Sequence, residues 1–243
     1  YNPFEAVNTN VVGTRNLVDI AVQHKVERFI GISTDKAVNP LSTMGATKLL
    51  SEKIITNAPI GNSPVKFCCV RFGNVLNSTG SVIPKFREQI KNGGPVTITS
   101  KDMTRFFMNL TDAVKLVLKA AQLVNGGETF ILKMRALRII DLADVLIEEL
   151  AAKYGHNPKS IKYKITGIRE AEKLYESLMN KEESLFMTDL GDMFKLCNSL
   201  LAQYCYSNIQ PTKGIEIADY NSNSISLLNK KEIAKMLHKD KIL

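Results

Sequence analysis

The sequence predicts an α/β fold built around a parallel sheet. Two apolar runs, residues 28–33 and 65–72, have the composition of buried strands, and residues 44–57 between them have helical character. A strand, a helix and a second strand in this order favour parallel pairing, because parallel strands need a long crossover that a helix normally supplies. The chain has 243 residues, 44% of them hydrophobic, which suits one large domain or one and a half.

The first 75 residues supply this sheet and its helices in order. Residues 3–23 carry apolar side chains at roughly helical spacing and predict a helix before the first strand. After that strand Pro40 interrupts the chain, and a second helix is expected to begin near Ser42 or Thr43. Pro59 ends this helix before the second strand. We therefore assign residues 1–75 to part of a doubly wound domain.

Beyond residue 75 the predicted elements are shorter and mixed. They are helices at 82–91, 113–123 and 139–154, and strands at 96–99, 129–132 and 160–165. Thr111 and Asp112 are suited to cap the second of these helices. We expect residues 76–183 to form mainly a smaller α/β domain, interleaved with the first. Residues 184–243 read as a tail that is helical in part, with a polar loop at 221–224 and a short helix at 230–237.

Composition argues against several classes of function. The net charge is +8, but the 32 Lys and Arg residues are scattered and do not alternate with aromatic residues, so no nucleic-acid partner is expected. No stretch reaches the ~18 uncharged apolar residues of a membrane helix. The cysteines lack metal-ligand spacing and are expected to be reduced thiols; they are Cys68, Cys69, Cys197 and Cys205. The histidines are expected on the surface, with no metal site; they are His24, His156 and His238.

The most informative segment follows the first strand. Residues 33–40 read STDKAVNP, and residues 44–48, at the start of the next helix, read MGATK. A hydroxyl, a carboxylate and an amine therefore stand in a row at the carboxyl end of a strand, where catalytic groups of open α/β sheets gather. Met44 and Lys48 share one helical face. A surface ion pair is the alternative interpretation of Asp35 and Lys36, but the flanking residues favour catalysis.

Together with further stretches in the same order, these residues resemble the extended short-chain dehydrogenases/reductases. More narrowly they resemble the CapD-like polysaccharide-biosynthesis family of UDP-N-acetylglucosamine 4,6-dehydratases. The matching stretches are NTNVVGT at 8–14, VRFGNV at 70–75, GSVIP at 80–84, DMTRFFM at 102–108, ITGIR at 165–169 and EKLYE at 172–176. The resemblance extends to about residue 183. It implies a Rossmann-like domain followed by a substrate domain.

Two departures from the family accompany this resemblance. The superfamily's Tyr of the pattern Y-x-x-x-K is Met44 here, as in some members of the resembled subfamily. The Gly-rich dinucleotide loop G-x-x-G-x-x-G is absent, since none of the 14 glycines falls in that pattern. We therefore expect this chain to be the back part of a longer protein.

The resemblance implies removal of water from a UDP-linked N-acetylhexosamine, with NAD or NADP as cofactor and a 4-keto-6-deoxy sugar as product. It assigns Asp35 as the acid for the C6 hydroxyl and Lys36 as the base at C5. Ser33 and Lys48 are implied to contact the cofactor, and Lys48 is also counted among the catalytic residues. Because the thioether of Met44 accepts no proton from the C4 hydroxyl, Thr34 or Asp35 must do so, directly or through water.

The resemblance also implies substrate contacts in the second part of the chain. Asn74 is placed to bond the sugar or phosphate, and Arg105 can bridge the diphosphate in a fork that Lys cannot copy. Arg169 and Glu172 resemble the contacts to the nucleotide end, although the family's Pro-Gly between them is Glu170-Ala171 here. For each Arg, a structural ion pair is the alternative.

Three functional interpretations remain. The first is the dehydratase for cell-surface glycan synthesis. The second is a nucleotide-sugar 4-epimerase, which needs C4 chemistry but not the Asp35–Lys36 pair and normally relies on the Tyr that Met44 replaces. The third is a truncated remnant without catalysis. We expect a cytoplasmic protein, with a parent that could be anchored in a membrane, and a homo-oligomer is possible.

Overall fold

The computed structural model describes residues 2–58, 63–197 and 219–243. The chain divides into two compact units that interleave along the sequence. Unit 1 comprises residues 1–73, 111–133 and 177–221, and unit 2 comprises residues 74–110, 134–176 and 222–243. Residues 184–243, predicted as a tail, therefore contribute to both units.

Unit 1 is a five-stranded sheet in the order β1-β2-β6-β11-β10. The strands β1 (Arg28–Thr34), β2 (Lys66–Phe72) and β6 (Glu128–Leu132) pair in parallel, while β11 (Met193–Leu196) and β10 (Met187–Asp189) complete the sheet antiparallel. The predicted parallel sheet is thus confirmed, and the antiparallel strands at its far side were not predicted.

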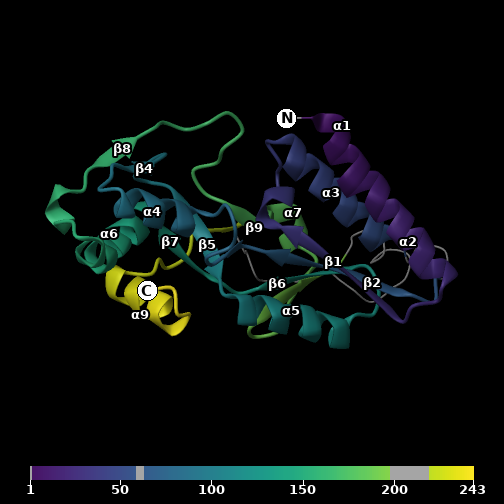
Figure 1. The fold of residues 1–243 in the computed structure, drawn as a ribbon. Helices are drawn as coiled ribbons and strands as arrows, with labels where there is room; N and C mark the ends of the chain where they lie inside the picture. Colours follow the sequence, from purple (N-terminus) through teal and green to yellow (C-terminus); the bar gives the residue numbers. More distant parts are fainter. Residues whose placement is uncertain (1, 59–62, 198–218) are drawn as a thin grey trace. The chain divides into compact units, whose positions relative to one another are not determined.

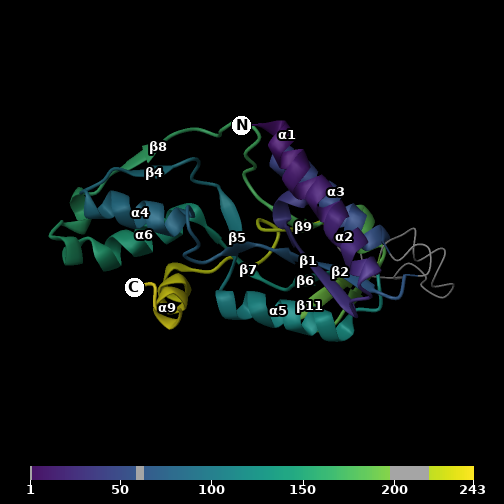
Figure 2. The same ribbon diagram turned by 45° about the vertical axis from the view of Figure 1, so that its right-hand side comes forward.

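Helices cover both faces of this sheet (Figures 1 and 2). On one face, α1 (Pro3–Ala6), a π-helical segment (Val7–Val12) and α2 (Gly13–Gln23) form the continuous helix predicted at 3–23, and α3 (Thr43–Asn57) packs beside it. On the other face lies α5 (Leu110–Leu123). The apolar layer under α2 and α3 contains Val18, Ala21, Ile55, Val65, Phe67 and Cys69. Burying these side chains is what holds the helices on the sheet.

The last segment of unit 1, residues 177–221, contributes three further short elements. Strand β9 (Ser177–Met179) pairs antiparallel with β12 (Tyr220–Asn221), and α7 (Lys181–Ser184) follows β9 directly. Strand β9 contacts the 3₁₀ turn Asp35–Ala37 that follows β1. None of these elements was predicted.

Unit 2 contains two small sheets and three helices. Strands β3 (Asn74–Val75), β5 (Thr104–Met108) and β7 (Arg135–Arg138) form one sheet, and β4 (Val96–Ile98) pairs in parallel with β8 (Tyr163–Ile165) in the other. The helices are α4 (Val82–Lys91), α6 (Ile139–Leu150) and α9 (Lys230–Lys239). A large apolar cluster that includes Ile83, Leu142 and Ile233 holds them together.

Several predicted boundaries in this region were wrong. Helix α5 begins at Leu110, so Thr111 and Asp112 lie in its first turn and do not cap it. Helix α6 ends at Leu150 and is followed by a separate 3₁₀ turn, and the strand expected at 160–165 is only Tyr163–Ile165. In the predicted polar loop 221–224, Asn221 lies in β12 and Ser222 is fully buried, where its hydroxyl bonds Thr104.

Candidate active site

The turn that follows β1 gathers three of the predicted catalytic residues. Thr34 has an extended backbone and caps the 3₁₀ turn Asp35–Ala37, with its hydroxyl accepting from the Lys36 amide at 3.4 Å. The same hydroxyl donates to Oδ1 of Asp35 at 2.9 Å. The Lys36 ammonium also donates to Oδ1 of Asp35, at 2.8 Å. Oδ1 of Asp35 thus accepts hydrogen bonds from the side chains of both sequence neighbours, Thr34 and Lys36.

The second oxygen of this carboxylate is in a different situation. Asp35 is 0% exposed, and its Oδ2 has no hydrogen-bond partner among the described residues. The buried hydroxyl of Ser33, two residues earlier, likewise has no partner in the described part of the chain. An unsatisfied buried polar group costs about 1–3 kcal/mol. Buried polar groups without a partner are rare in native structures, so these two at the end of a strand mark it as a candidate site.

Helix α3 presents its first turn to this segment. Ser42 caps the helix by accepting from the Gly45 amide at 3.1 Å, and Gly45 is buried against the carbonyl of Lys36. Met44 is 43% exposed, and Lys48, one turn further on, donates to the carbonyl of Ile32 at 2.7 Å. The helix that carries Met44 and Lys48 therefore packs directly on the turn that carries Asp35 and Lys36.

A cavity of about 220 Å³ opens beside this helix and the end of β1. It is lined by Thr14 and Leu17 of α2, by Ile32 and Ser33 of β1, and by Lys48 of α3. Ser33, whose hydroxyl has no partner in the described residues, and Lys48 therefore line the same cavity. These donors suit the ribose and carboxamide oxygens of a nicotinamide nucleotide, and contact with the cofactor stays a prediction for both residues. The residues that would hold its pyrophosphate are not in this sequence, because the Gly-rich loop is absent.

The predicted substrate residues all lie in unit 2. Asn74 begins β3 and pairs with Phe107. Arg105 is 9% exposed, and its guanidinium donates to three backbone carbonyls: those of Thr104 at 2.7 Å, Leu174 at 3.1 Å and Lys173 at 2.8 Å. Nε of Arg105 also lies 3.8 Å from the Glu176 carboxylate, which is an ion pair of the kind given above as the alternative.

The loop held by Arg105 carries the other two residues. Arg169 is exposed, and its amide donates to the carboxylate of Glu172 at 3.2 Å. The hydroxyl of Thr99 donates to the same carboxylate at 3.4 Å. Ala171 has a φ of +57°, in the left-handed region that glycine enters at least cost. Ala171, which stands where the family has Gly, thus has a backbone conformation that favours Gly.

The sequence interpretation overlooked Gly45. A glycine inside a helix lowers its stability, so its place two residues after Thr43 was a signal of close backbone approach. Of the histidines expected on the surface, His24 and His238 are exposed, whereas His156 is half-buried and its ring bonds the Lys91 carbonyl. Cys68 and Cys69 are buried, free thiols; burial, with the carboxylate of Glu128, raises the pKa of Cys68 to about 12. Cys205 lies outside the described residues.

The described residues contain neither a group of metal ligands nor a helix that could span a membrane. Among residues 2–58, 63–197 and 219–243, no three His, Cys, Asp or Glu side chains are grouped to hold a metal ion. Within the same part of the chain, none of the helices combines the length and apolar character needed to cross a bilayer.

Comparison with known proteins decides the family. The profile of the family described as polysaccharide biosynthesis protein matches residues 1–198. The chain belongs to this family. It is an extended short-chain dehydrogenase/reductase, as predicted. The capsular polysaccharide biosynthesis protein CapD of Staphylococcus aureus is 49% identical over 184 residues, which are 75% of this chain and 30% of CapD.

Two relatives match nearly the whole chain. An uncharacterized membrane protein of Methanocaldococcus jannaschii is 54% identical over 239 residues, covering 98% of this chain and 69% of that protein. A UDP-glucose 4-epimerase of Rickettsia rickettsii is 39% identical over 241 residues, with the same two coverages. One of these two relatives of the chain is thus named as a nucleotide-sugar enzyme.

Solved structures confirm the predicted Rossmann-like fold. Pen from Bacillus thuringiensis has a TM-score of 0.89 and 39% identity, covering all of this chain and 71% of Pen. DesIV, a dTDP-glucose 4,6-dehydratase of Streptomyces venezuelae with NAD and TYD bound, has a TM-score of 0.59 at 20% identity over 69% of this chain and 56% of DesIV. The second likeness concerns the fold alone.

Proposed function

We propose that this chain carries the proton-transfer machinery of a nucleotide-sugar 4,6-dehydratase that acts on a UDP-linked N-acetylhexosamine for glycan synthesis. The observation that supports it most is the Asp35 carboxylate, which is fully buried and has one oxygen bonded by Thr34 and Lys36 and the other without a partner in the described residues. A surface ion pair would leave the carboxylate in water. Burial of this kind is typical of a carboxyl group that exchanges protons with a ligand.

Dehydration requires two proton transfers at neighbouring carbons. In the proposal, the amine of Lys36 takes the C5 proton, and Oδ2 of Asp35 gives a proton to the C6 oxygen as the C6–O bond breaks and water leaves. Asp35 acquires the proton it gives to the C6 oxygen from the C4 hydroxyl, directly or through Thr34 or water, and Lys36 returns its proton to C5 when C6 is reduced, so both groups end in their starting protonation states. The 2.8 Å bond between Lys36 Nζ and Asp35 Oδ1 holds the two groups side by side.

The redox part of the reaction belongs to a cofactor. A nicotinamide dinucleotide, when bound, supplies the hydride exchange at C4 and C6. Ser33 and Lys48 would hold its nicotinamide ribose end beside the Asp35–Lys36 turn. DesIV binds NAD, which supports this class of cofactor, and the choice between NAD and NADP stays open. In the same proposal, unit 2 binds the sugar nucleotide through Asn74, Arg169 and Glu172.

An epimerase is the second candidate, because the Rickettsia rickettsii relative is a UDP-glucose 4-epimerase with 39% identity. Against it stands Met44, whose thioether accepts no proton at the position where the superfamily has Tyr.

One assay separates these reactions. The 243-residue chain and the longest natural protein that contains it are each incubated with UDP-N-acetylglucosamine and NAD or NADP, and the sugar product is identified by NMR. We expect a 4-keto-6-deoxy sugar from the longer protein; UDP-N-acetylgalactosamine would select the epimerase. The 243-residue chain alone is expected to give neither, because its sequence lacks the pyrophosphate-binding loop. Turnover by this chain comparable to the longer protein would refute that expectation.

A further inference from the structure

A fully buried arginine holds three elements of unit 1 together. Arg71, on β2, is 1% exposed. Its guanidinium bonds the Glu52 carboxylate twice, from Nε at 3.0 Å and from Nη2 at 2.5 Å. It bonds the Glu183 carboxylate twice as well, from Nη1 at 2.8 Å and from Nη2 at 2.6 Å. The carbonyl of Leu178 accepts the remaining N–H, at 2.9 Å. All five donors of the fork are used, which no other side chain can do.

The charges of this cluster reinforce one another. Burial alone would lower the pKa of Arg71, but Glu52 and Glu183 outweigh burial and raise it. Burial alone would raise the pKa of Glu183, but hydrogen bonds from Arg71 outweigh it and lower the pKa. Arg71 and Glu183 are therefore both charged at neutral pH. A buried charge network of this kind is costly to break, because removal of one member leaves the others unpaired.

The partners of Arg71 belong to the elements that surround the Asp35–Lys36 turn. Glu52 lies on α3 one turn after Lys48 and two turns after Met44, so the three side chains share one helical face. Leu178 lies on β9, the strand that contacts the turn Asp35–Ala37. Because Arg71 fixes Glu52, it fixes the rotation of α3 about its axis. Because it also bonds the Leu178 carbonyl, it fixes the position of β9 relative to the turn Asp35–Ala37.

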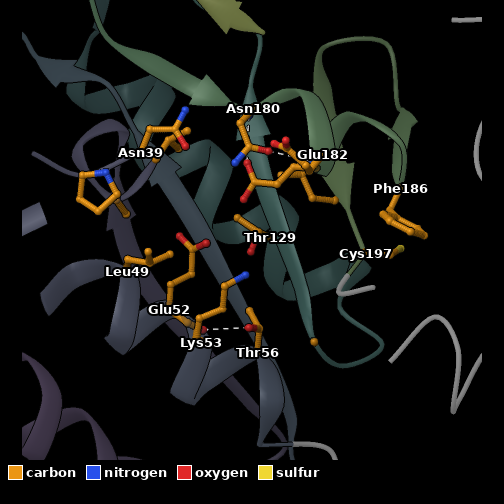
Figure 3. A pocket seen from close by; sticks show the side chains of 16 residues that line it. Asn39, Leu49, Glu52, Lys53, Thr56, Thr129, Asn180, Glu182, Phe186 and Cys197 are labelled. Atoms are coloured by element: carbon orange, nitrogen blue, oxygen red, sulfur yellow. Dashed lines mark hydrogen bonds between the residues drawn. The ribbon is translucent and has the colours of Figure 1, made fainter. Parts of the chain in front are cut away.

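Apolar packing does not make this connection by itself. A cavity of about 330 Å³ lies between α3 and the segment that follows β9. Figure 3 shows Glu52 and Lys53 on one side of it, Asn180 and Glu182 on the other, and Thr129 of β6 between them. Because open space separates these elements here, α3 has room to shift if the polar link is lost.

We propose that Arg71 is a positioning residue: by clamping Glu52, Glu183 and the Leu178 carbonyl, it holds α3 and β9 so that Met44 and Lys48 face the Asp35–Lys36 turn. The proposal deepens the function proposed above, and its catalytic consequence rests on that function. Arg71 itself contacts neither the sugar nor the cofactor in this scheme.

The test compares Arg71→Lys with Phe67→Leu in the longest natural protein that contains this chain. Both residues lie on the same face of β2, and both are buried, but Phe67 contributes packing and no hydrogen bond to the clamp. Lysine keeps the positive charge and loses the fork. The measurements are hydrogen exchange of peptides that cover residues 33–48, and kcat and KM for the nucleotide sugar, at a temperature where both variants are folded.

We expect Arg71→Lys to speed hydrogen exchange in residues 33–48 by about tenfold or more over Phe67→Leu. We expect kcat to fall about 10- to 100-fold with KM nearly unchanged, because the reacting groups are misplaced while the substrate residues of unit 2 are untouched. Equal exchange and equal kcat in the two variants would overturn the proposal. If the exchange difference appears but the unmodified protein turns over no nucleotide sugar, the clamp stands and the proposed function fails.

Discussion

The backbone of α3 at Gly45 lies directly against the carbonyl oxygen of Lys36. A methyl group at Gly45 would collide with this oxygen and would lie 3.0 Å from the side chain of Pro40. The carbonyl of Lys36 belongs to the turn Asp35–Ala37, and Pro40 lies three residues after that turn. A carbonyl of the main chain cannot swing aside as a side chain can. The absence of a side chain at Gly45 therefore sets how closely the helix of Met44 and Lys48 approaches the turn.

The first prediction concerns this contact. We expect Gly45→Ala to destabilise the protein by about 1–3 kcal/mol, the usual cost of forcing extra atoms into a packed site. Gly13→Ala is the control, because it makes the same change in α2, where the nearest atom stays 3.5 Å away. That substitution should stabilise the helix by about 0.5–1 kcal/mol. Thermal unfolding measures both, and a stabilising effect of Gly45→Ala would contradict the close approach.

The second prediction tests the carboxylate. Asp35→Asn keeps the shape of the side chain but removes its ability to exchange a proton, so we expect dehydration to fall roughly 100-fold or more. Asp189→Asn is a matched control, since Asp189 is also bonded by a lysine, Lys133 at 2.7 Å, but is 44% exposed. It should leave the rate unchanged. A near-normal rate for Asp35→Asn in a stable protein would remove Asp35 from the mechanism.

The hydroxyl of Thr34 is tested by a third pair of variants. Thr34→Val removes the donor to Asp35 Oδ1 and the cap of the 3₁₀ turn, whereas Thr34→Ser retains both. We expect the valine variant to lose roughly tenfold or more in kcat, and the serine variant to stay within a few-fold of the unmodified protein. Steady-state kinetics decide this. Equal rates in the two variants would show that the hydroxyl has no part in proton transfer.

The fourth prediction separates two roles for Arg105. Its N–H groups are used on the carbonyls of Thr104, Lys173 and Leu174, so Arg105→Lys should loosen the loop that carries Arg169 and Glu172. We expect faster hydrogen exchange in residues 167–176 and a loss of about 1–3 kcal/mol in the stability of unit 2. Arg138→Lys is the control, because Arg138 is half exposed and pairs with Asp141 in the first turn of α6, outside this loop. Unchanged exchange in the loop would favour a ligand contact over a structural one.

The sequence predicts the first half of unit 1 well because its elements are local. Residues 3–23, 28–33 and 44–57 each show their own period or apolar run, and the helix expected to begin near Ser42 or Thr43 is capped by Ser42. Strand β5 was missed because all five of its residues are buried, so it shows no alternation of polar and apolar side chains. Strand β9 was missed because its partner β12 lies some forty residues further along the chain, as the pair Ser177 and Asn221 illustrates.

In the candidate site, too, the groups that are adjacent in the sequence could be predicted and those that are far apart in the sequence could not. The order Ser33, Thr34, Asp35, Lys36 is contiguous, so the sequence alone places these groups at the end of a strand. The clamp is not contiguous: Glu52 and Glu183 are separated from Arg71 by 19 and 112 residues. An arginine within an apolar strand gives no hint of which carboxylates neutralise it, because burial and pairing are consequences of tertiary packing.

The last prediction follows from the ionisation of Glu183. Because Arg71 lowers the pKa of Glu183 in the folded protein below its ordinary value of about 4.5, this carboxylate stabilises the fold fully above about pH 4.5. The stabilisation is lost as the pH falls through the lower, folded-state pKa, since the protonated acid no longer pairs with Arg71. We therefore expect Glu183→Gln to cost about 3–5 kcal/mol at pH 7 and progressively less as the pH falls below 4.5.

Glu232→Gln is the matched control for this experiment. Glu183 and Glu232 occupy the same position in a capping box, after Asn180 and Asn229, and each pairs with an arginine. Glu232 differs in that it is solvated, so its replacement should change stability little at any pH. Native-state hydrogen exchange of β2 and of α9 reports the two sites separately. If Glu183→Gln proves as mild as Glu232→Gln at pH 7, the buried guanidinium does not depend on its second carboxylate, and the clamp reduces to the pair of Arg71 with Glu52.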